Sequence, residues 1–353
     1  MTPIQNRIDA FAKLGDFLRQ FSRREIIKND FVVYNDLFFD DFQHQIQLAQ
    51  RNNSWFTKNH ILYAIECWSE ALKKDHLVTW ISNENLNHHS AKKVAIIMAG
   101  NIPLVGFHDF LSVLITGHTA LIKQSSNDKD LLPFLAKYLS SVDSIFKKKI
   151  VFTEEQLKDY DAVIATGSNN TARYFEYYFK NKPSIIRRNR NSVAVIQGNE
   201  TPKDFEKLGE DIFQYFGLGC RNVSKIFVPR NFDFDLFFKE MYHQHEVIQH
   251  HKYANNYDYN KAVYLMSEFD ILENGFLIIK EDKSYASPIA SIFYEYYDDP
   301  IDLKVKLDED SDKIQCIVAN NFIEGDINFG QTQQPKLWDY ADGVNTLDFL
   351  ATI

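Results

Sequence analysis

The stretch with the clearest chemical potential is a glycine-spaced loop that carries one cysteine, Phe216-Gly217-Leu218-Gly219-Cys220. Its two glycines allow a tight turn and leave space beside the sulfur. Arg221 and Lys225 follow closely, and a nearby positive charge lowers the pKa of a thiol and favours the reactive thiolate. The pattern therefore predicts a nucleophile at Cys220. It also fits a helix that ends at a C-cap glycine and is followed by a small buried cysteine.

The other two cysteines, Cys67 and Cys316, are predicted to be structural. Cys67 lies next to the apolar face of an expected helix, and Cys316 lies inside an expected strand. Three scattered thiols indicate a reducing, cytoplasmic compartment without a disulfide framework. The sequence has no Cys-x-x-Cys or His-Glu-x-x-His pattern, so no metal site is predicted.

Histidine is the residue type that could pair with a nucleophilic cysteine. Segment 234–251 is expected to be one helix, and we interpret its histidines as part of a polar face, with a His–Cys pair at Cys220 as the alternative. These are His243, His245, His250 and His251. His108 is expected to be packed or capped within its own helix.

Composition excludes several classes of protein. The chain has 353 residues, 45% of them apolar and 25% charged, and a net charge of -9. A nucleic-acid partner needs a basic face, so none is expected. The most apolar stretch, 94–115, is interrupted by Asn101, Pro103, His108 and Asp109, so no membrane-spanning segment is expected. The N-terminus does not have the layout of a signal peptide.

The elements around these residues indicate an α/β protein. Residues 1–90 are predicted to be mostly helical, because apolar side chains recur at helical spacing in 4–21, 41–50 and 59–74. From Lys93, short apolar runs alternate with helical periods, which indicates a parallel-stranded unit. We expect strands at 94–99, 119–123, 150–152, 162–166 and 192–197. We expect helices at 103–117, 129–144, 171–180 and 204–216.

Three turns follow expected strands, and in an open parallel sheet such turns form the ligand crevice. They are Gly100-Asn101, Lys123-Gln124-Ser125 and Gly167-Ser168. A glycine and a hydroxyl at a helix N-terminus suit a phosphate or pyrophosphate, although Ser168 alone also fits a simple N-cap. No Gly-x-Gly-x-x-Gly occurs, so a dinucleotide would not bind through the usual fingerprint.

Four stretches, in order and with compatible spacing, resemble motifs of the aldehyde dehydrogenase superfamily. Gly100-Asn101-Ile102-Pro103 is similar to its Asn-x-Pro turn, and Ala120-Leu121-Ile122-Lys123-Gln124-Ser125 to its Lys-Pro-Ser strand end. Thr166-Gly167-Ser168 is similar to its Thr-Gly-Ser turn, and Phe216-Gly217-Leu218-Gly219-Cys220 to its nucleophile loop. The short length and the run from Cys220 to Lys225 resemble more specifically the fatty acyl-CoA reductase family of bacterial bioluminescence. The likeness extends well over about 90–235.

This resemblance implies a fold and a role for each matched position. The fold would be aldehyde dehydrogenase-like, with a helical region at 1–90, a Rossmann-like coenzyme domain at 91–198, a catalytic domain at 199–330 and an oligomerisation tail at 331–353. Cys220 would be the nucleophile, and the Asn101 amide with the Cys220 N–H would form an oxyanion hole. The coenzyme would lie against two pairs of residues, Lys123 with Ser125 at the adenosine ribose or its 2′-phosphate, and Gly167 with Ser168 at the pyrophosphate.

Two departures from the superfamily bear on the reaction. The Glu-Leu-Gly-Gly-Lys segment, whose glutamate activates water, corresponds here to Arg187-Arg188-Asn189-Arg190-Asn191, which has no carboxylate. Water attack on a thioacyl enzyme should then be slow, which favours exchange with a thiol. These arginines could also hold coenzyme or CoA phosphates, or form a solvated basic turn. In the Glu-x-Phe-Gly-Pro segment, Ser284 stands where the superfamily has a glutamate on the nicotinamide ribose.

The resemblance thus implies an oxidoreductase, an acyl-CoA reductase that makes a fatty aldehyde through a Cys220 thioester intermediate. NADP is the expected coenzyme, with NAD as the other possibility, and the substrate would be an acyl-CoA or another acyl thioester. The implied partners are further copies of the chain and acyl-transfer proteins. Two alternatives remain: a Cys–His acyltransferase or thioesterase, and a non-catalytic relative that serves as a partner subunit.

Overall fold

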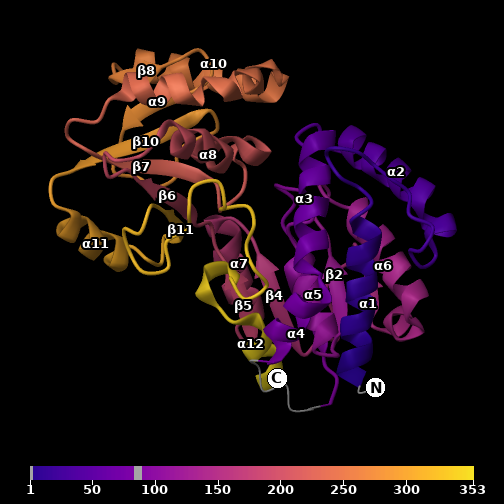
Figure 1. Cartoon of the computed structure of the whole chain (residues 1–353). Coiled ribbons are helices and arrows are strands. Elements are labelled where there is room, and N and C mark those ends of the chain that lie inside the picture. Colours follow the sequence, from indigo (N-terminus) through magenta and orange to yellow (C-terminus); the bar gives the residue numbers. More distant parts are fainter. Residues whose placement is uncertain (1–2, 83–89) are drawn as a thin grey trace. The chain divides into compact units, whose positions relative to one another are not determined.

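The computed structural model describes residues 3–82 and 90–353. The chain divides into two units, which Figure 1 labels by element. Unit 1 comprises residues 1–188 and 336–353, and unit 2 comprises residues 189–335. Each unit has its own sheet, and the predicted α/β class is confirmed. The boundaries that we expected at residues 90, 198 and 330 stay predictions about functional domains.

Three of the N-terminal helices of unit 1 cover segments in which the periodicity predicts a helix, and a fourth, at Lys74–Ser82, was not predicted separately. They are α1 (Pro3–Leu18), α2 (Asn35–Asn52), α3 (Lys58–Ala71) and α4 (Lys74–Ser82). Aromatic side chains of α1 and α2 build much of their core: Phe17 stacks on Tyr138 at 4.3 Å between ring centroids, and Phe21 meets Phe42 edge-on at 4.8 Å. The last part of the expected helical region, residues 83–89, lies outside the described residues.

A five-stranded parallel sheet forms the rest of unit 1. Its strands are β1 (Lys93–Ile97), β2 (Thr119–Lys123), β3 (Ile150–Phe152), β4 (Ala162–Thr166) and β5 (Ser184–Arg187), in the order β3-β2-β1-β4-β5. The strands read as continuous apolar runs because both faces are covered. Val94 and Ile96 face the large helical core, whereas Ala95, Val163 and Ala165 face α7 (Asn169–Phe179).

The turn after β1 is longer than the sequence predicts. The helix expected at 103–117 begins only at Phe107, as α5 (Phe107–Ile115), so the prediction that Pro103 starts it was wrong. The reason is the backbone of Leu104, which adopts a left-handed conformation with φ of 58° that is incompatible with a helix. The N–H of Leu104 donates instead to the carboxylate of Asp128 at 2.8 Å.

Unit 2 contains a six-stranded sheet in the order β11-β6-β7-β10-β9-β8. Its strands are β6 (Asn191–Val195), β7 (Val223–Pro229), β8 (Ile271–Glu273), β9 (Ile278–Glu281), β10 (Ser291–Tyr297) and β11 (Ile314–Val318), and all pairs are parallel except β8 with β9. Strand β6 falls within the range expected for the coenzyme domain, yet it pairs with β7 and β11 in this sheet.

The helices of unit 2 are α8 (Pro202–Phe213), α9 (Phe234–Met241), α10 (His251–Met266) and α11 (Pro300–Glu309). Two of them, α8 and α9, end earlier than the sequence predicts. The single helix expected at 234–251 was wrong, because a 3₁₀ segment over Tyr242–Gln249 separates α9 from α10. The helix expected at 204–216 ends at Phe213, since Tyr215 and Phe216 have left-handed backbone angles.

The C-terminal tail is part of unit 1, where a buried ion pair helps to anchor it. The guanidinium of Arg187, at the end of β5, pairs with the carboxylate of Asp109 at 2.5 Å. It also donates to the hydroxyl of Thr346, at the start of α12 (Thr346–Thr352), at 3.1 Å. Both charged side chains are less than 10% exposed, so each depends on the other to offset its desolvation.

Breaking this ion pair should destabilise unit 1. We expect Arg187→Met to lower the free energy of unfolding by about 3–5 kcal/mol, because it leaves the Asp109 carboxylate buried without its counter-ion. The measurement is urea unfolding followed by tryptophan fluorescence, which reports unit 1 because Trp55, Trp68, Trp80 and Trp338 all belong to it. The control is Arg187→Met with Asp109→Leu, which should recover most of the loss; an equal loss in both variants would contradict the interpretation.

Candidate active site

Three predicted coenzyme-side turns lie at one edge of the unit 1 sheet, the edge that is formed by the carboxyl ends of its parallel strands. Strand β1 pairs with β2 on one side and with β4 on the other, and Ile97 is in register with both Lys123 and Ala165. The carboxyl ends of these parallel strands are therefore adjacent, and the strand order reverses at β1, which is where open α/β sheets bind ligands. The edge is visible where β2 and β4 are labelled in Figure 1.

The turns after β1 and β2 are in direct contact. A Cβ atom on Gly100 would lie 2.6 Å from the hydroxyl of Ser125, so the side chain of Ser125 occupies the space that a larger residue at position 100 would need. The Leu104–Asp128 hydrogen bond joins the same two turns. Burial raises the pKa of Asp128 to about 7. Asn101 is exposed on the turn between these two points of attachment.

The remaining coenzyme-side residues have local partners. The ammonium of Lys123 donates to the carbonyl of Glu155 at 3.2 Å. Ser168 is the N-cap of α7, where its hydroxyl accepts from the N–H of Thr171, so the N-cap interpretation of this residue is confirmed. Ser168 is also exposed at the helix N-terminus, which leaves the positive end of the helix dipole accessible to an anion.

Cys220 lies in unit 2 and is exposed. Its loop connects a 3₁₀ turn over Gln214–Gly217 to β7. Tyr215 and Phe216 have φ angles of 56° and 58°, a conformation that non-glycine residues rarely adopt and that costs about 1–3 kcal/mol each. Such strain persists only where surrounding contacts hold the backbone in place.

The side chain of Asn222 supplies those contacts. Its Oδ1 accepts from the N–H of Gly219 at 2.8 Å, and its Nδ2 donates to the carbonyls of Asp211 at 3.0 Å and Gln214 at 2.9 Å. Its own backbone N–H donates to the carbonyl of Gly219 at 3.0 Å. Asn222 is 2% exposed, so these bonds are shielded from water. They tie the residue before Cys220 to the end of α8.

A second buried group, the carboxylate of Asp211, fixes a distant segment against the same loop. It accepts from the N–H of Gly330 at 2.7 Å and from the N–H and hydroxyl of Thr332 at 3.0 and 2.8 Å. The carbonyl of Thr332 in turn accepts from Nε of Arg221 at 2.5 Å. Burial raises the pKa of Asp211 to about 6, although these hydrogen bonds act in the opposite direction.

One cationic residue that the sequence suggested for the site, Lys225, is paired with a carboxylate. Lys225 is fully buried, and its ammonium lies 2.7 Å from the carboxylate of Glu295 and donates to the carbonyls of Asp282 and Lys283. Its proposed role in activating Cys220 was wrong, because its charge is balanced by Glu295. Burial is the largest influence on Lys225 and lowers its pKa.

The arginine cluster at 187–190 is also not a solvated basic turn. Arg187 is buried against Asp109, and Arg188 pairs with Glu176 at the surface. Arg190 donates to the carbonyls of Ser311 and Ile314. Each guanidinium has a protein partner, so the suggested phosphate-binding role has no support from these contacts.

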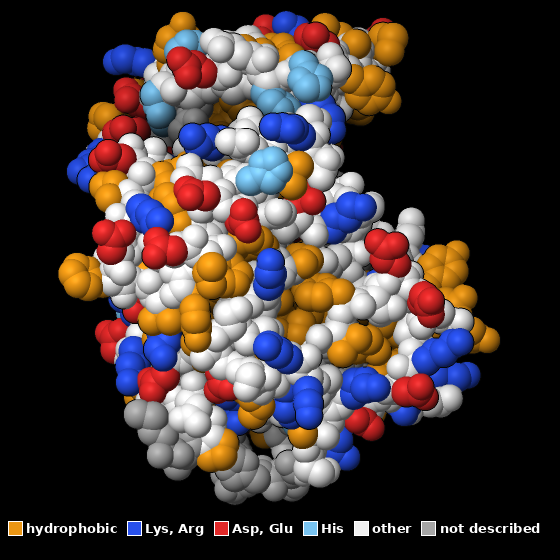
Figure 2. Space-filling view, turned by 90° about the vertical axis from the view of Figure 1, so that its right-hand side faces the viewer, with side chains coloured by type: hydrophobic (Ala, Val, Ile, Leu, Met, Phe, Trp, Pro, Cys, Tyr) orange, Lys and Arg blue, Asp and Glu red, His pale blue; other side chains and the backbone are white. Residues whose placement is uncertain are grey.

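Four of the histidines, His243, His245, His250 and His251, belong to unit 2, and pale-blue histidine side chains are visible in the upper part of Figure 2, where Figure 1 places α9 and α10. His243 and His245 bond to the carbonyls of Glu240 and Tyr242 within their own segment. The ring of His250 stacks on that of Phe216 at 4.2 Å, four residues before Cys220. In unit 1, His108 is packed as expected, with Nε2 2.9 Å from the carbonyl of Leu337, and burial lowers its pKa.

The other cysteines and Ser284 have separate environments. Burial raises the pKa of Cys67 to about 11, which fits its predicted structural role. Cys316 is half-buried on β11, with its sulfur 2.9 Å from the hydroxyl of Ser192. Ser284 is exposed, and its N–H donates to the carboxylate of Asp282 at 2.8 Å. Among the described residues, no group of three or more His, Cys, Asp or Glu could hold a metal ion.

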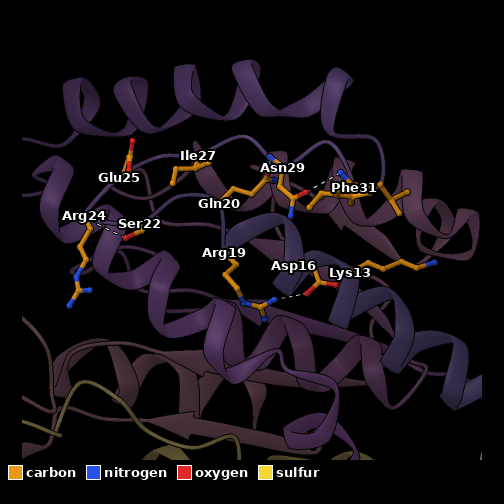
Figure 3. Close-up of a pocket in the computed structure, with 12 residues that line it drawn as sticks. Lys13, Asp16, Arg19, Gln20, Ser22, Arg24, Glu25, Ile27, Asn29 and Phe31 are labelled. Carbon is orange, nitrogen blue, oxygen red and sulfur yellow. Dashed lines mark hydrogen bonds and ion pairs between the residues drawn. The ribbon is translucent and has the colours of Figure 1, made fainter.

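Two cavities lie within single units. A pocket of about 590 Å³ in unit 1 (Figure 3) is lined by residues 13–33 and contains none of the predicted site residues. A slot of about 30 Å³ in unit 2 lies against the cysteine loop and is lined by Phe216, Gly217, Tyr253 and Ile292 among others. The slot has room for about one water-sized group, so it does not hold a long chain in this conformation.

Comparison with known proteins identifies the family. The family model described as acyl-CoA reductase (LuxC) matches residues 17–267, which include both the sheet edge of unit 1 and Cys220. The chain belongs to the acyl-CoA reductase (LuxC) family. It is 23% identical over 279 residues to the long-chain acyl-protein thioester reductase of Aliivibrio fischeri, a match that covers 72% of this chain and 55% of the relative. The chain thus spans about half the length of that relative.

Solved structures show that this LuxC-family chain has the aldehyde dehydrogenase fold. An NAD⁺ complex of an aldehyde dehydrogenase from Bacillus cereus has a TM-score of 0.60 at 14% identity, over 90% of this chain and 72% of that one. The aldehyde dehydrogenase KauB of Pseudomonas aeruginosa has a TM-score of 0.63 at 12% identity, over 90% and 72%. Within residues 3–82 and 90–353, no helix is long and apolar enough to cross a membrane.

Sequence reasoning did not single out the residues that hold the cysteine loop of this family member. Asn222 directly follows Arg221 in the motif that we quoted, and Asp211 is a charged residue on a helix with an apolar face. The position of Asn222 in the motif and the charge of Asp211 on that helix were signals that could have pointed to these residues. The segment that Asp211 binds, around Thr332, is 121 residues away along the chain, and no sequence pattern connects the two.

Removing the Asn222 amide should loosen the Cys220 loop. We expect Asn222→Ala to lower the stability of unit 2 by about 1–3 kcal/mol, because a buried N–H and several carbonyls lose their partner. Asn222→Asp should be at least as harmful, since it turns a carboxylate oxygen toward carbonyls. Urea unfolding by circular dichroism measures the loss, and tryptophan fluorescence, which reports unit 1, should be unchanged. Wild-type stability in Asn222→Asp would contradict this role.

Asp211 should make the stability of unit 2 depend on pH. Its pKa is about 6 in the folded protein and 3.8 in a model compound, so the folded state binds more protons between pH 4 and 6. Stability from this group is therefore greatest below pH 4 and falls, by about 3 kcal/mol, as the pH rises to 6. Urea unfolding across this range should show the decline in the wild type and a smaller one in Asp211→Asn. Equal slopes would contradict the assignment.

Proposed function

We propose that this protein is a nicotinamide-dependent acyl-CoA reductase that converts a fatty acyl thioester to an aldehyde. The observation that carries the proposal is the exposed Cys220 on a loop held by buried hydrogen bonds, in a chain of the acyl-CoA reductase (LuxC) family. A nucleophile needs accessibility and a fixed position, and this loop has both.

In the first step, the thiolate of Cys220 attacks the carbonyl carbon of the acyl-CoA. The new carbon–sulfur bond forms, negative charge develops on the carbonyl oxygen, and the CoA thiolate leaves and takes a proton. The amide of Asn101 and the N–H of Cys220 are the proposed donors to that oxygen. A preorganised donor of this kind contributes about 10²–10³ in rate.

In the second step, the Cys220 thioester is reduced. The reduced nicotinamide, when bound, supplies a hydride to the acyl carbon. The carbon–sulfur bond then breaks, the aldehyde leaves, and Cys220 returns to its thiolate. Glycines at 100 and 167 are part of the proposed coenzyme-side turns, and a Cβ atom on either would lie 2.6–3.0 Å from side-chain atoms of the protein, so both turns are closely packed.

The coenzyme contacts favour NADPH, with NADH as the alternative. Lys123 and Ser125 at the end of β2 would bind the adenosine ribose or its 2′-phosphate, and a lysine ammonium is suited to a phosphate. Gly167 and Ser168 would lie at the pyrophosphate, beside the N-terminus of α7. The solved relatives described as NAD⁺ complexes support a nicotinamide coenzyme without distinguishing the two.

The segment that carries a catalytic glutamate in aldehyde-oxidising relatives has no carboxylate here, and its Arg187 is buried against Asp109. No residue of this segment can activate water against the thioester, so exchange with a thiol is the favoured reaction. The donor would be an acyl-CoA or, as the name of the Aliivibrio fischeri relative suggests, an acyl-protein thioester. Further copies of the chain and acyl-transfer proteins are the proposed partners.

One observation favours a second function. The stacking of His250 on Phe216 places an imidazole beside the cysteine loop, as a Cys–His acyltransferase or thioesterase would require. That function would need no nicotinamide. A non-catalytic relative that serves as a partner subunit would need neither an imidazole beside the cysteine loop nor a nicotinamide.

Turnover assays separate these functions. With a long-chain acyl-CoA and NADPH, we expect nicotinamide oxidation in the wild type and at least a ~1,000-fold loss in Cys220→Ala, because the covalent step is removed. Cys67→Ser is the matched control and should retain the wild-type rate. Release of CoA without nicotinamide oxidation would indicate a transferase or thioesterase, and equal inactivity of wild type and Cys220→Ala would contradict both catalytic functions.

A further inference from the structure

A hydrogen-bonded chain of three residues ends at the main chain of Cys220. The hydroxyl of Ser192 donates to the carbonyl oxygen of Cys220 at 3.0 Å. The sulfur of Cys316 lies 2.9 Å from the same hydroxyl. A serine hydroxyl has one proton, and a carbonyl can only accept. Since that proton is directed to Cys220, the thiol of Cys316 is the donor to Ser192.

The sheet of unit 2 is irregular at this point. Ile314 pairs with Asn191 and Ile317 with Val193, so Gln315 and Cys316 together oppose the single residue Ser192. This is the pattern of a β-bulge, which redirects side chains and is frequent beside active sites. The register between β6 and β7 also shifts at Ser192. Both irregularities therefore coincide at the residue that contacts Cys220.

The hydrogen bond from Ser192 fixes the main chain of Cys220 on its C-terminal side. On the N-terminal side, Asn222 holds both the N–H and the carbonyl of Gly219. On the C-terminal side, Ser192 holds the carbonyl of Cys220 itself. Ser192 is fully buried, so water does not compete for this bond. With the peptide groups on both sides fixed, the direction of the Cα–Cβ bond of Cys220 is fixed as well.

We propose that Ser192 and Cys316 are positioning residues for Cys220: the thiol of Cys316 orients the hydroxyl of Ser192, which holds the main chain of the nucleophile. Cys316 is thus neither a second nucleophile nor only a core residue. This inference rests on the proposed function, in which Cys220 attacks the acyl carbon. It predicts that the two residues act in series, so that Cys316 influences Cys220 only through Ser192.

Two measurements on the full chain test the proposal. The first is the rate of Cys220 alkylation by iodoacetamide across pH 6–10 (roughly the range in which thiols ionise), resolved by peptide mass spectrometry. The second is kcat and KM with acyl-CoA and NADPH. In Ser192→Ala we expect the alkylation profile to move to higher pH and kcat to fall about 3–10-fold, with the KM for NADPH unchanged, because one hydrogen bond to the loop is lost. Ser192→Thr, which keeps the hydroxyl, should restore both.

The serial arrangement makes a sharper prediction. Cys316→Ala should have a smaller effect of about 2–3-fold, since Ser192 still reaches Cys220 but is no longer oriented. Cys316→Ser, which keeps a donor, should stay near the wild type. The double variant Ser192→Ala with Cys316→Ala should match Ser192→Ala alone, because the pair acts as one unit.

Three results would overturn the proposal. The first is a multiplicative loss in the double variant. The second is a Ser192→Ala variant that loses thermal stability but keeps its alkylation profile and kcat within twofold. The third is a Cys316→Ser variant as impaired as Cys316→Ala. Failure of the proposed function is distinguishable, because wild-type protein without acyl-CoA reduction would still reveal, through alkylation, whether Ser192 controls Cys220.

Discussion

The reactive loop of unit 2 depends on one buried side-chain amide, that of Asn222. It acts as donor and acceptor at the same time, so it can satisfy both the N–H of Gly219 and the carbonyls at the end of α8. A carboxylate could not donate at all, and a hydroxyl has one proton where the amide nitrogen has two for the carbonyls. These bonds hold the left-handed backbone at Tyr215 and Phe216 and thereby present Cys220 at the surface. Asp211 and Ser192 extend the same fixation to more distant segments.

In unit 1, the corresponding constraint is the close approach of two turns at the sheet edge. The absent side chain of Gly100 lets Ser125 come within contact distance, and Asp128 holds the unusual backbone of Leu104. The exposed Asn101 therefore belongs to a turn that is fixed on both sides. Rigid turns at the carboxyl ends of parallel strands are what a phosphate-bearing ligand requires, because its binding uses main-chain donors whose positions must be set in advance.

In this protein, the place where a cationic side chain is buried decides which group it pairs with, and its neighbours in the sequence do not. Lys225 is five residues from Cys220, yet its ammonium is paired with Glu295 inside unit 2. Arg187 is one of three arginines within the four residues 187–190, yet it is buried against Asp109 in unit 1. An unpaired charge in a protein interior is costly, and Lys225 and Arg187 each have a carboxylate partner. Arg221, which contacts Thr332, remains the cation adjacent to the nucleophile.

The sequence by itself determined the α/β class, four of the strands of unit 1 and the order of the motifs, because apolar periodicity and glycine spacing are local properties of the chain. It also determined that Gly100, Lys123 and Gly167 follow strands, from which parallel pairing brings them to one edge. Only the tertiary structure decided which charges are balanced, where the helix after Asn101 begins, and that Asn222, Asp211, Thr332 and Ser192 hold the nucleophile loop. These features depend on partners up to 121 residues apart, and side-chain hydrogen bonds between such distant residues leave no periodic trace in a single sequence.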